Sequence, residues 1–161
     1  MKGILLVFLS FFAAVSVDLG TVRQQFGEAK DSKAATEKLY ASLSTYSKDD
    51  PVLLAYKGAS YTLKARYVAA KAEKRQMVSQ GIQLIEQAVK AALKQLEIRL
   101  VRLAVQENSP KILKYKTNIT EDKQALFSDI KAQPAAVQSL IKRYAKQSTL
   151  FTADEQKKLG L

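Results

Sequence analysis

Cysteine, histidine and tryptophan are all absent from this chain of 161 residues. The lack of cysteine excludes disulfides, a thiol nucleophile and a cysteine-linked lipid anchor. The lack of histidine removes the commonest metal ligand and the commonest general base near neutral pH. We therefore expect a non-enzymatic protein with no catalytic residues, no metal and no cofactor. A hydrolase that uses paired acids is the disfavoured alternative, because no nucleophile motif or phosphate-binding glycine loop occurs.

Acidic residues are few: Lys and Arg number 26 against 15 Asp and Glu, which gives a net charge of +11. A basic balance favours anionic partners such as acidic glycans or anionic lipid headgroups. The lysines are scattered and form no block of five or six, which is typical of a solvated surface rather than a basic tail. For an exported protein we expect no nucleic acid partner.

One apolar run stands out, at the N-terminus, which reads MKGILLVFLSFFAAVSVDL. Lys2 precedes it, and Ala14 and Ser16 are the small residues expected before a signal-peptidase cleavage point. From Gly3 to Val17 the run is shorter than the roughly 20 residues of a membrane-spanning helix, which favours a cleaved signal over a retained anchor. We predict a signal peptide at 1–16 and a periplasmic or secreted mature chain without a transmembrane span.

Apolar residues recur at helical spacing through 17–161, and no stretch alternates with the period of a strand. We predict a single all-α domain of six to seven helices, arranged as antiparallel hairpins in a tetratricopeptide-like array or an irregular bundle. Gly58 in the middle of a helix predicts that another helix crosses closely there. The expected helices cover about 21–46 with a break near Ser32, 51–69, 71–93, 97–107, 121–132, a segment opened by Pro134, and a short one that ends at Gly160.

Polar residues mark the expected helix ends. Asp49 or Asp50 is predicted to cap the helix that Pro51 begins, and Thr152 with Glu155 forms a capping box. In the same way, Thr120 is predicted to cap a helix whose first turn holds Glu121 and Asp122, where acids complement the helix dipole. Asn108, shortly before Pro110, is predicted to take the left-handed position that ends a helix.

The stretch 97–115, EIRLVRLAVQENSPKILKY, sets two arginines into an apolar helix. Arg99 and Arg102 are three residues apart, so they project near one another, and we expect at least one to be half-buried. A buried guanidinium needs a carboxylate or carbonyl partner, which Glu86 or Glu97 could supply. A structural ion pair that determines helix register is favoured over a pocket for an anionic ligand.

Tyr56 lies off the apolar row of its helix, so we expect its ring at the surface. With Lys57, Arg99 and Arg102 it is a candidate contact for a protein or peptide bound in a helix-lined groove. The alternative function is electrostatic association with anionic lipid or polysaccharide of the cell envelope.

Several runs resemble one group of proteins: LLAYKGASYTLKARY at 53–67, GIQLIEQAV at 81–89, and NITEDK at 118–123 together with the stretch 97–115. They are similar to small uncharacterised secreted proteins of Bacteroidetes bacteria, which look like tetratricopeptide-type helical domains with no assigned activity. The resemblance covers most of the mature chain and departs at 90–95, where Pro and Asn usually precede the Glu-Ile-Arg. It implies an exported all-α protein, supplies no catalytic residues, and leaves partner and oligomeric state open.

Overall fold

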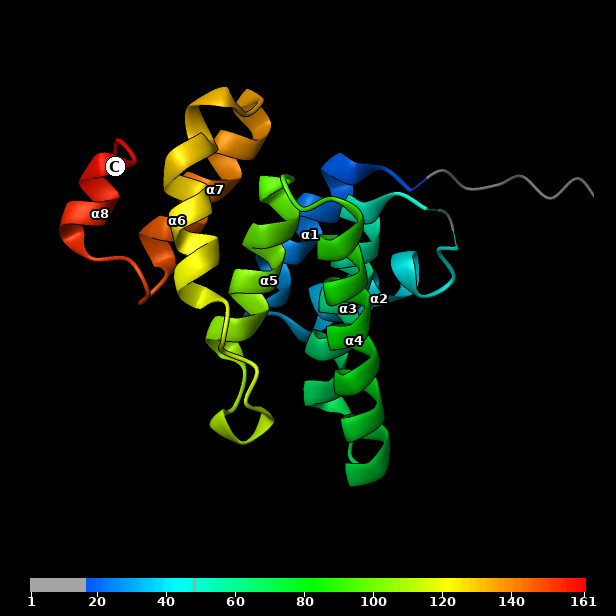
Figure 1. The fold of residues 1–161 in the computed structure, drawn as a ribbon. Helices are drawn as coiled ribbons and strands as arrows, with labels where there is room; N and C mark the ends of the chain where they lie inside the picture. Colours follow the sequence, from blue (N-terminus) through cyan, green and yellow to red (C-terminus); the bar gives the residue numbers. More distant parts are fainter. Residues whose placement is uncertain (1–16, 48) are drawn as a thin grey trace, which may run out of the picture.

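The computed structural model describes residues 17–47 and 49–161, and this part of the chain is helical without any strand (Figure 1). The predicted signal peptide at 1–16 lies outside the described residues. The α-helices are α1 (Leu19–Ala29), α2 (Lys33–Ser44), α3 (Pro51–Lys64), α4 (Lys71–Ala91), α5 (Leu96–Asn108), α6 (Ile119–Asp129), α7 (Ala135–Gln147) and α8 (Ala153–Lys158). Short 3₁₀ turns are η1 (Ala65–Tyr67), η2 (Lys111–Leu113) and η3 (Ile130–Ala132). Within the described ranges, every helix is too short or too polar to cross a membrane.

The described residues thus contain eight α-helices, more than the six to seven that we expected. The difference arises at Ser32, whose hydroxyl accepts a hydrogen bond from the Ala35 amide and begins α2 as a separate helix. Asp50 caps α3 as predicted, accepting from the amides of Val52 and Leu53. A side chain that satisfies the first amides of a helix determines where the helix begins.

Two predicted helix ends are wrong. Asn108 is the last residue of α5 and is helical, not left-handed. The helix stops after it because Pro110 forces Ser109, the residue before the proline, into an extended conformation. Among the described residues, the non-glycine residue with a positive φ is Lys114, whose φ is 49°. Thr120 does not cap α6, which begins one residue earlier at Ile119.

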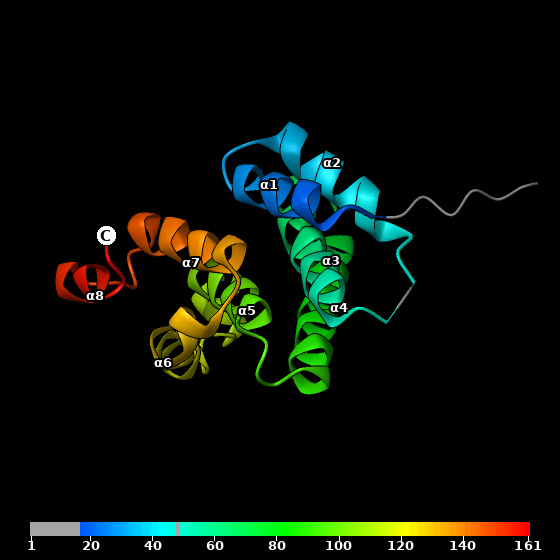
Figure 2. The same ribbon diagram turned by 90° about the horizontal axis from the view of Figure 1, so that it is seen from above.

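Gly58 and Gly81 bring α3 and α4 into close contact, as the mid-helix glycine predicted. A Cβ atom added to Gly58 would lie 2.5 Å from the carbonyl oxygen of Gly81. These two helices lie side by side in both views (Figures 1 and 2). Helices α1 and α2 pack against α3 of this pair.

Helix α5 separates two apolar clusters and belongs to both. Its residues Ile98, Val101 and Val105 pack into the first cluster, with α1 to α4. Its residues Leu96, Leu100 and Leu103 pack into the second, with α6, α7 and residues on either side of α8. Figure 2 shows α5 between these two groups of helices. A helix that is apolar on opposite faces must be covered on both, so α5 holds the two halves together.

Candidate functional site

Arg102 of α5 is sealed inside the molecule by a two-pronged ion pair with Asp122 of α6. Its Nε lies 2.7 Å from Asp122 Oδ2, and its Nη2 lies 2.7 Å from Oδ1. The Arg102 and Asp122 side chains are 4% and 0% exposed, and Glu86 Oε2 lies 3.2 Å from Nη1. Burial alone would lower the pKa of Arg102, but the two carboxylates outweigh it and raise the pKa above its usual value. Arg102 is therefore a structural cation.

Arg99 lies beside this pair at the start of α6. Its Nη1 contacts Glu121 Oε1 at 2.7 Å and Asp122 Oδ1 at 3.0 Å, while its Nε donates to the Leu93 carbonyl at 2.9 Å. Glu121 and Asp122 lie in the first turn of α6 as predicted, and the two oxygens of Asp122 in addition bind both arginines. The predicted Arg102–Glu86 pair exists, but the shorter contacts are to Asp122.

Glu97 points toward α1 and α3 and pairs with Arg23 instead of an arginine of its own helix. Arg23 Nε and Nη2 lie 2.7 Å and 2.6 Å from the two carboxylate oxygens of Glu97. Tyr56 donates its hydroxyl to Glu97 Oε1 at 2.8 Å. The Glu97 side chain is 1% exposed and that of Arg23 is 23% exposed, so the carboxylate is buried while its arginine partner stays partly exposed.

The expectation that Tyr56 reaches the surface is wrong, because its side chain is fully buried. Helix α1 covers the face of α3 that the apolar row left open, and the ring of Phe26 packs edge-on against Tyr56 with centroids 5.2 Å apart. Burial, and then the charge of Glu97, raise the pKa of Tyr56. Lys57, the neighbouring candidate, is half-buried and donates to the Tyr46 carbonyl at 2.6 Å.

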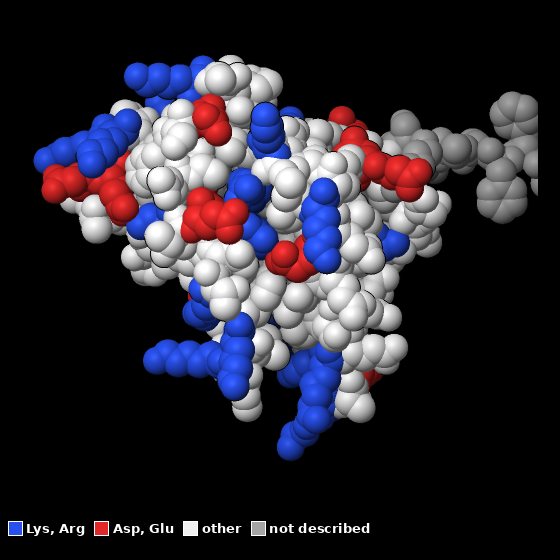
Figure 3. All heavy atoms as spheres, in the orientation of Figure 1, with Lys and Arg blue, Asp and Glu red and all other residues white. Residues whose placement is uncertain are grey.

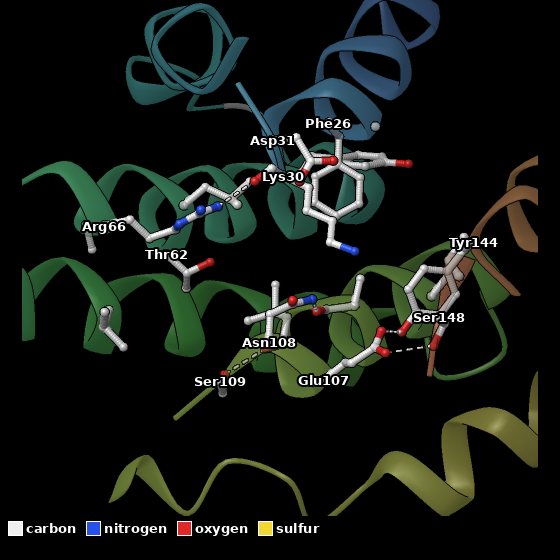
Figure 4. A pocket seen from close by; sticks show the side chains of 18 of the residues that line it. Phe26, Lys30, Asp31, Thr62, Arg66, Glu107, Asn108, Ser109, Tyr144 and Ser148 are labelled. Carbon is white, nitrogen blue, oxygen red and sulfur yellow. Dashed lines mark hydrogen bonds between the residues drawn. The ribbon is translucent and has the colours of Figure 1, made fainter. Parts of the chain in front are cut away.

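A groove of about 900 Å³ lies where the two halves of the molecule meet (Figure 4). Helices α1, α3 and α4 form one wall, and α5, η2 and α7 form the other. Among the six candidate residues only Tyr56 contributes to its lining. Apolar side chains dominate the walls; they include Phe26, Leu63, Val78, Ile82, Val105 and Leu140.

Cations outnumber acids around this groove. Lys30 reaches toward its centre from the end of α1, and Arg66 binds the Lys30 carbonyl at 2.8 Å (Figure 4). The side chains of Lys30, Lys74, Arg75 and Arg143 form no hydrogen bond or ion pair with any of the described residues, in contrast to the buried arginines of α5. These cations are available to a ligand, whereas Arg99 and Arg102 already have carboxylate partners.

Glu107, one of three acids that line the groove, is held in place by α7 and the residues after it. Tyr144 donates to Oε2 at 2.6 Å, and Ser148 and the Thr149 amide donate to Oε1 at 2.9 Å each. Burial alone would raise the pKa of Glu107, but these hydrogen bonds outweigh it and the pKa lies below its usual value of 4.5. Burial and the nearby carboxylate raise the pKa of Tyr144. Glu107 is therefore ionised and Tyr144 protonated at neutral pH.

Sequence reasoning missed Arg23 and Asp122, the partners that make the candidate charges structural. Arg23 is 74 residues from Glu97, and Asp122 is 20 residues from Arg102. No local pattern signals such pairs, because each depends on which helices pack together. A helix-lined groove was expected, but apart from Tyr56 its lining residues were missed, because they converge from α1, α3, α4, α5 and α7.

The fold and this groove define a class: an all-helical protein with an open, apolar, cation-rimmed groove between two helical halves. Comparison of the chain with known protein families, with curated proteins and with solved structures gave no match.

Proposed function

We propose that this chain is an exported, non-enzymatic interaction module that binds a segment of another protein, or a peptide, in the groove between its two halves. The observation that carries the proposal is the apolar groove of about 900 Å³ with cations at its rim. Helix-lined grooves of this kind bind peptide segments by burying alternate or helically spaced apolar side chains. The apolar N-terminal run supports export, and the succession of short-looped helices supports a tetratricopeptide-like arrangement.

The lining specifies the chemistry of the segment. Apolar anchors would lie against Phe26 and Ile82 on one wall and Leu140 on the other. Acidic side chains beside those anchors would meet Lys30 and Arg143, which contribute charge from opposite walls. The expected partner is therefore an apolar segment flanked by aspartate or glutamate.

The protonation and hydrogen bonding of Glu107 and Tyr144 in the groove favour binding over catalysis. Glu107 is held by four donors from α7 and the residues after it, and its lowered pKa keeps it from acting as a general acid near neutral pH. The hydroxyl donor Tyr144 stays protonated, because its pKa is raised. Neither group is arranged to transfer a proton to a substrate.

Site-specific photo-crosslinking in intact cells tests this proposal. A photoreactive residue at Val78, which lines the groove from α4, should capture a defined partner. The same residue at Gln83, which is exposed on α4 and outside the lining, is the matched control. The captured segment, made as a peptide, should bind the purified protein in calorimetry.

A groove-filling variant completes the test. Ala104→Trp places a large ring in the groove from the half-buried wall of α5 and should abolish both the crosslink and peptide binding. Its helicity, measured by circular dichroism, should match that of the unmodified protein. Equal capture at Val78 and Gln83, or binding that survives Ala104→Trp, would overturn the groove as the binding site.

A further inference from the structure

The connection between α5 and α6 exposes apolar side chains instead of burying them. Ile112 is 88% exposed and Leu113 is 40% exposed. The turn that carries them is well defined, since the Leu113 amide donates to the Pro110 carbonyl and the Lys114 amide to the Lys111 carbonyl, each at 3.0 Å. Exposed single apolar residues are common on proteins, so Ile112 is informative only together with its surroundings.

The base of this loop is fastened to the body of the protein. Ser109 is buried and donates to the Val105 carbonyl at 2.7 Å, while the Tyr115 hydroxyl donates to Glu86 Oε1 at 2.6 Å. Lys116 donates to the Glu107 carbonyl at 2.9 Å. The loop is thus anchored on both sides of Ile112, and its apolar tip projects from a defined base.

Cations surround the tip and cover a second projection beside it, formed by η1 and the start of α4. Figure 3 shows Lys and Arg on both projections, at the bottom of the view. In the sequence of these two projections, 66–75 and 110–117, the only acid is Glu73. The basic residues are Arg66, Lys71, Lys74, Arg75, Lys111, Lys114 and Lys116. Such a local excess of positive charge fits a negatively charged surface, not another basic protein.

We propose that this two-pronged end docks on a bilayer surface that contains anionic lipid, with Ile112 and Leu113 entering the interface. Cations alone would fit any polyanion. An isoleucine that is almost fully exposed between Lys111 and Lys114 fits a surface whose anionic headgroups cover an apolar interior. The lysines bind headgroups while the aliphatic tip inserts, and both interactions contribute to the same partitioning.

This inference goes beyond peptide binding and does not depend on it. Ile112, Leu113, Lys74 and Arg75 also contribute to the lining of the groove, so docking would bring the mouth of the groove close to the lipid surface. The Ala104→Trp variant separates the two functions. It fills the groove on α5 but leaves both projections unchanged, so vesicle binding should persist when peptide binding is lost.

The absence of tryptophan allows a clean fluorescence experiment with single reporters. Ile112→Trp places the reporter on the tip. The matched control is Leu93→Trp, at a residue that is 59% exposed in the connection from α4 to α5. The 21 residues of α4 span about 30 Å between the second projection and that connection.

Phosphatidylcholine vesicles with and without phosphatidylglycerol are the probe. With phosphatidylglycerol, the emission of Ile112→Trp should shift to the blue and be quenched by brominated acyl chains, whereas Leu93→Trp should be unaffected. The affinity of Ile112→Asp for the same vesicles, measured by sedimentation, should be about tenfold or more weaker, because the apolar side chain no longer inserts. Raising the salt concentration should weaken binding further, since the charges are exposed.

Three results would overturn the proposal: no sedimentation with phosphatidylglycerol vesicles at low salt, equal quenching at both reporters, or unchanged binding of Ile112→Asp. Binding to dextran sulfate without vesicle binding would instead identify a soluble acidic polysaccharide as the partner. Ile112 is exposed, so its variants should fold normally, which circular dichroism can check.

Discussion

Gly58 of α3 and Gly81 of α4 face each other so closely that neither position has room for a side chain. A Cβ atom on either glycine would lie 2.5 Å from the carbonyl oxygen of the other. The obstructing atoms belong to the backbone, so they cannot rotate away. This reciprocal contact determines how α3 and α4 cross, and hence where α4 presents Val78 and Ile82 to the groove.

Gly58→Ala should therefore lower the free energy of unfolding by about 1–3 kcal/mol, the usual cost of overpacking, despite alanine's higher helix propensity. Gly27→Ala in α1 is the matched control, since the nearest atom to its Cβ would be Arg143 Nη1 at 4.0 Å. That variant should be neutral or more stable by up to about 1 kcal/mol. Urea unfolding followed by circular dichroism measures both. Equal stability of the two variants would contradict the close crossing.

Asp122→Ala should destabilise the protein by about 3–5 kcal/mol, because it leaves the buried Arg102 without its main partner. Asp154→Ala removes an exposed carboxylate 4.0 Å from Lys157 and should change stability by less than about 0.5 kcal/mol. The double variant Arg102→Met with Asp122→Leu should recover much of the loss, since it buries no charge. If Asp122→Ala behaves like Asp154→Ala in urea unfolding, the pair does not support the junction of α5 and α6.

Glu107→Gln tests the link between α5 and α7 through its dependence on pH. The folded-state pKa of Glu107 lies below its usual value of 4.5, so ionised Glu107 stabilises the fold above that pH. This contribution is lost as the pH falls through the folded-state pKa. The stability difference between the unmodified protein and Glu107→Gln should be largest near neutral pH and shrink in acid. Chemical unfolding of both proteins across that range measures it, and a difference that stays constant would argue against the hydrogen bonds from Tyr144 and Ser148.

Local features of the fold could be predicted well. Pro51 with Asp50, Ser32, and Thr152 with Glu155 mark helix starts that the structure confirms, since a cap involves neighbours within three residues. The prediction failed at Asn108, where the conformational restriction imposed by Pro110 outweighed the tendency of asparagine to end helices.

The candidate site was harder to predict, and Tyr56 shows why. A single helix reveals its most apolar face, but not whether a second helix covers another face. Helix α1 covers Tyr56, and Arg23 from that helix supplies the counter-charge of Glu97. The prediction of buried Arg–carboxylate pairing was correct in kind for Arg102, but its main partner is Asp122.

The sequence by itself determined the all-helical class, most helix starts and the close crossing at Gly58, because these follow from periodicity and from contacts between near neighbours. Only the tertiary structure decided which carboxylate meets which arginine, that α5 is covered on both sides, and that a groove opens between the halves. Those features depend on the packing of helices that are distant in sequence. A charge that such packing buries needs a partner of opposite charge, whereas the cations at the groove and on the two projections stay exposed.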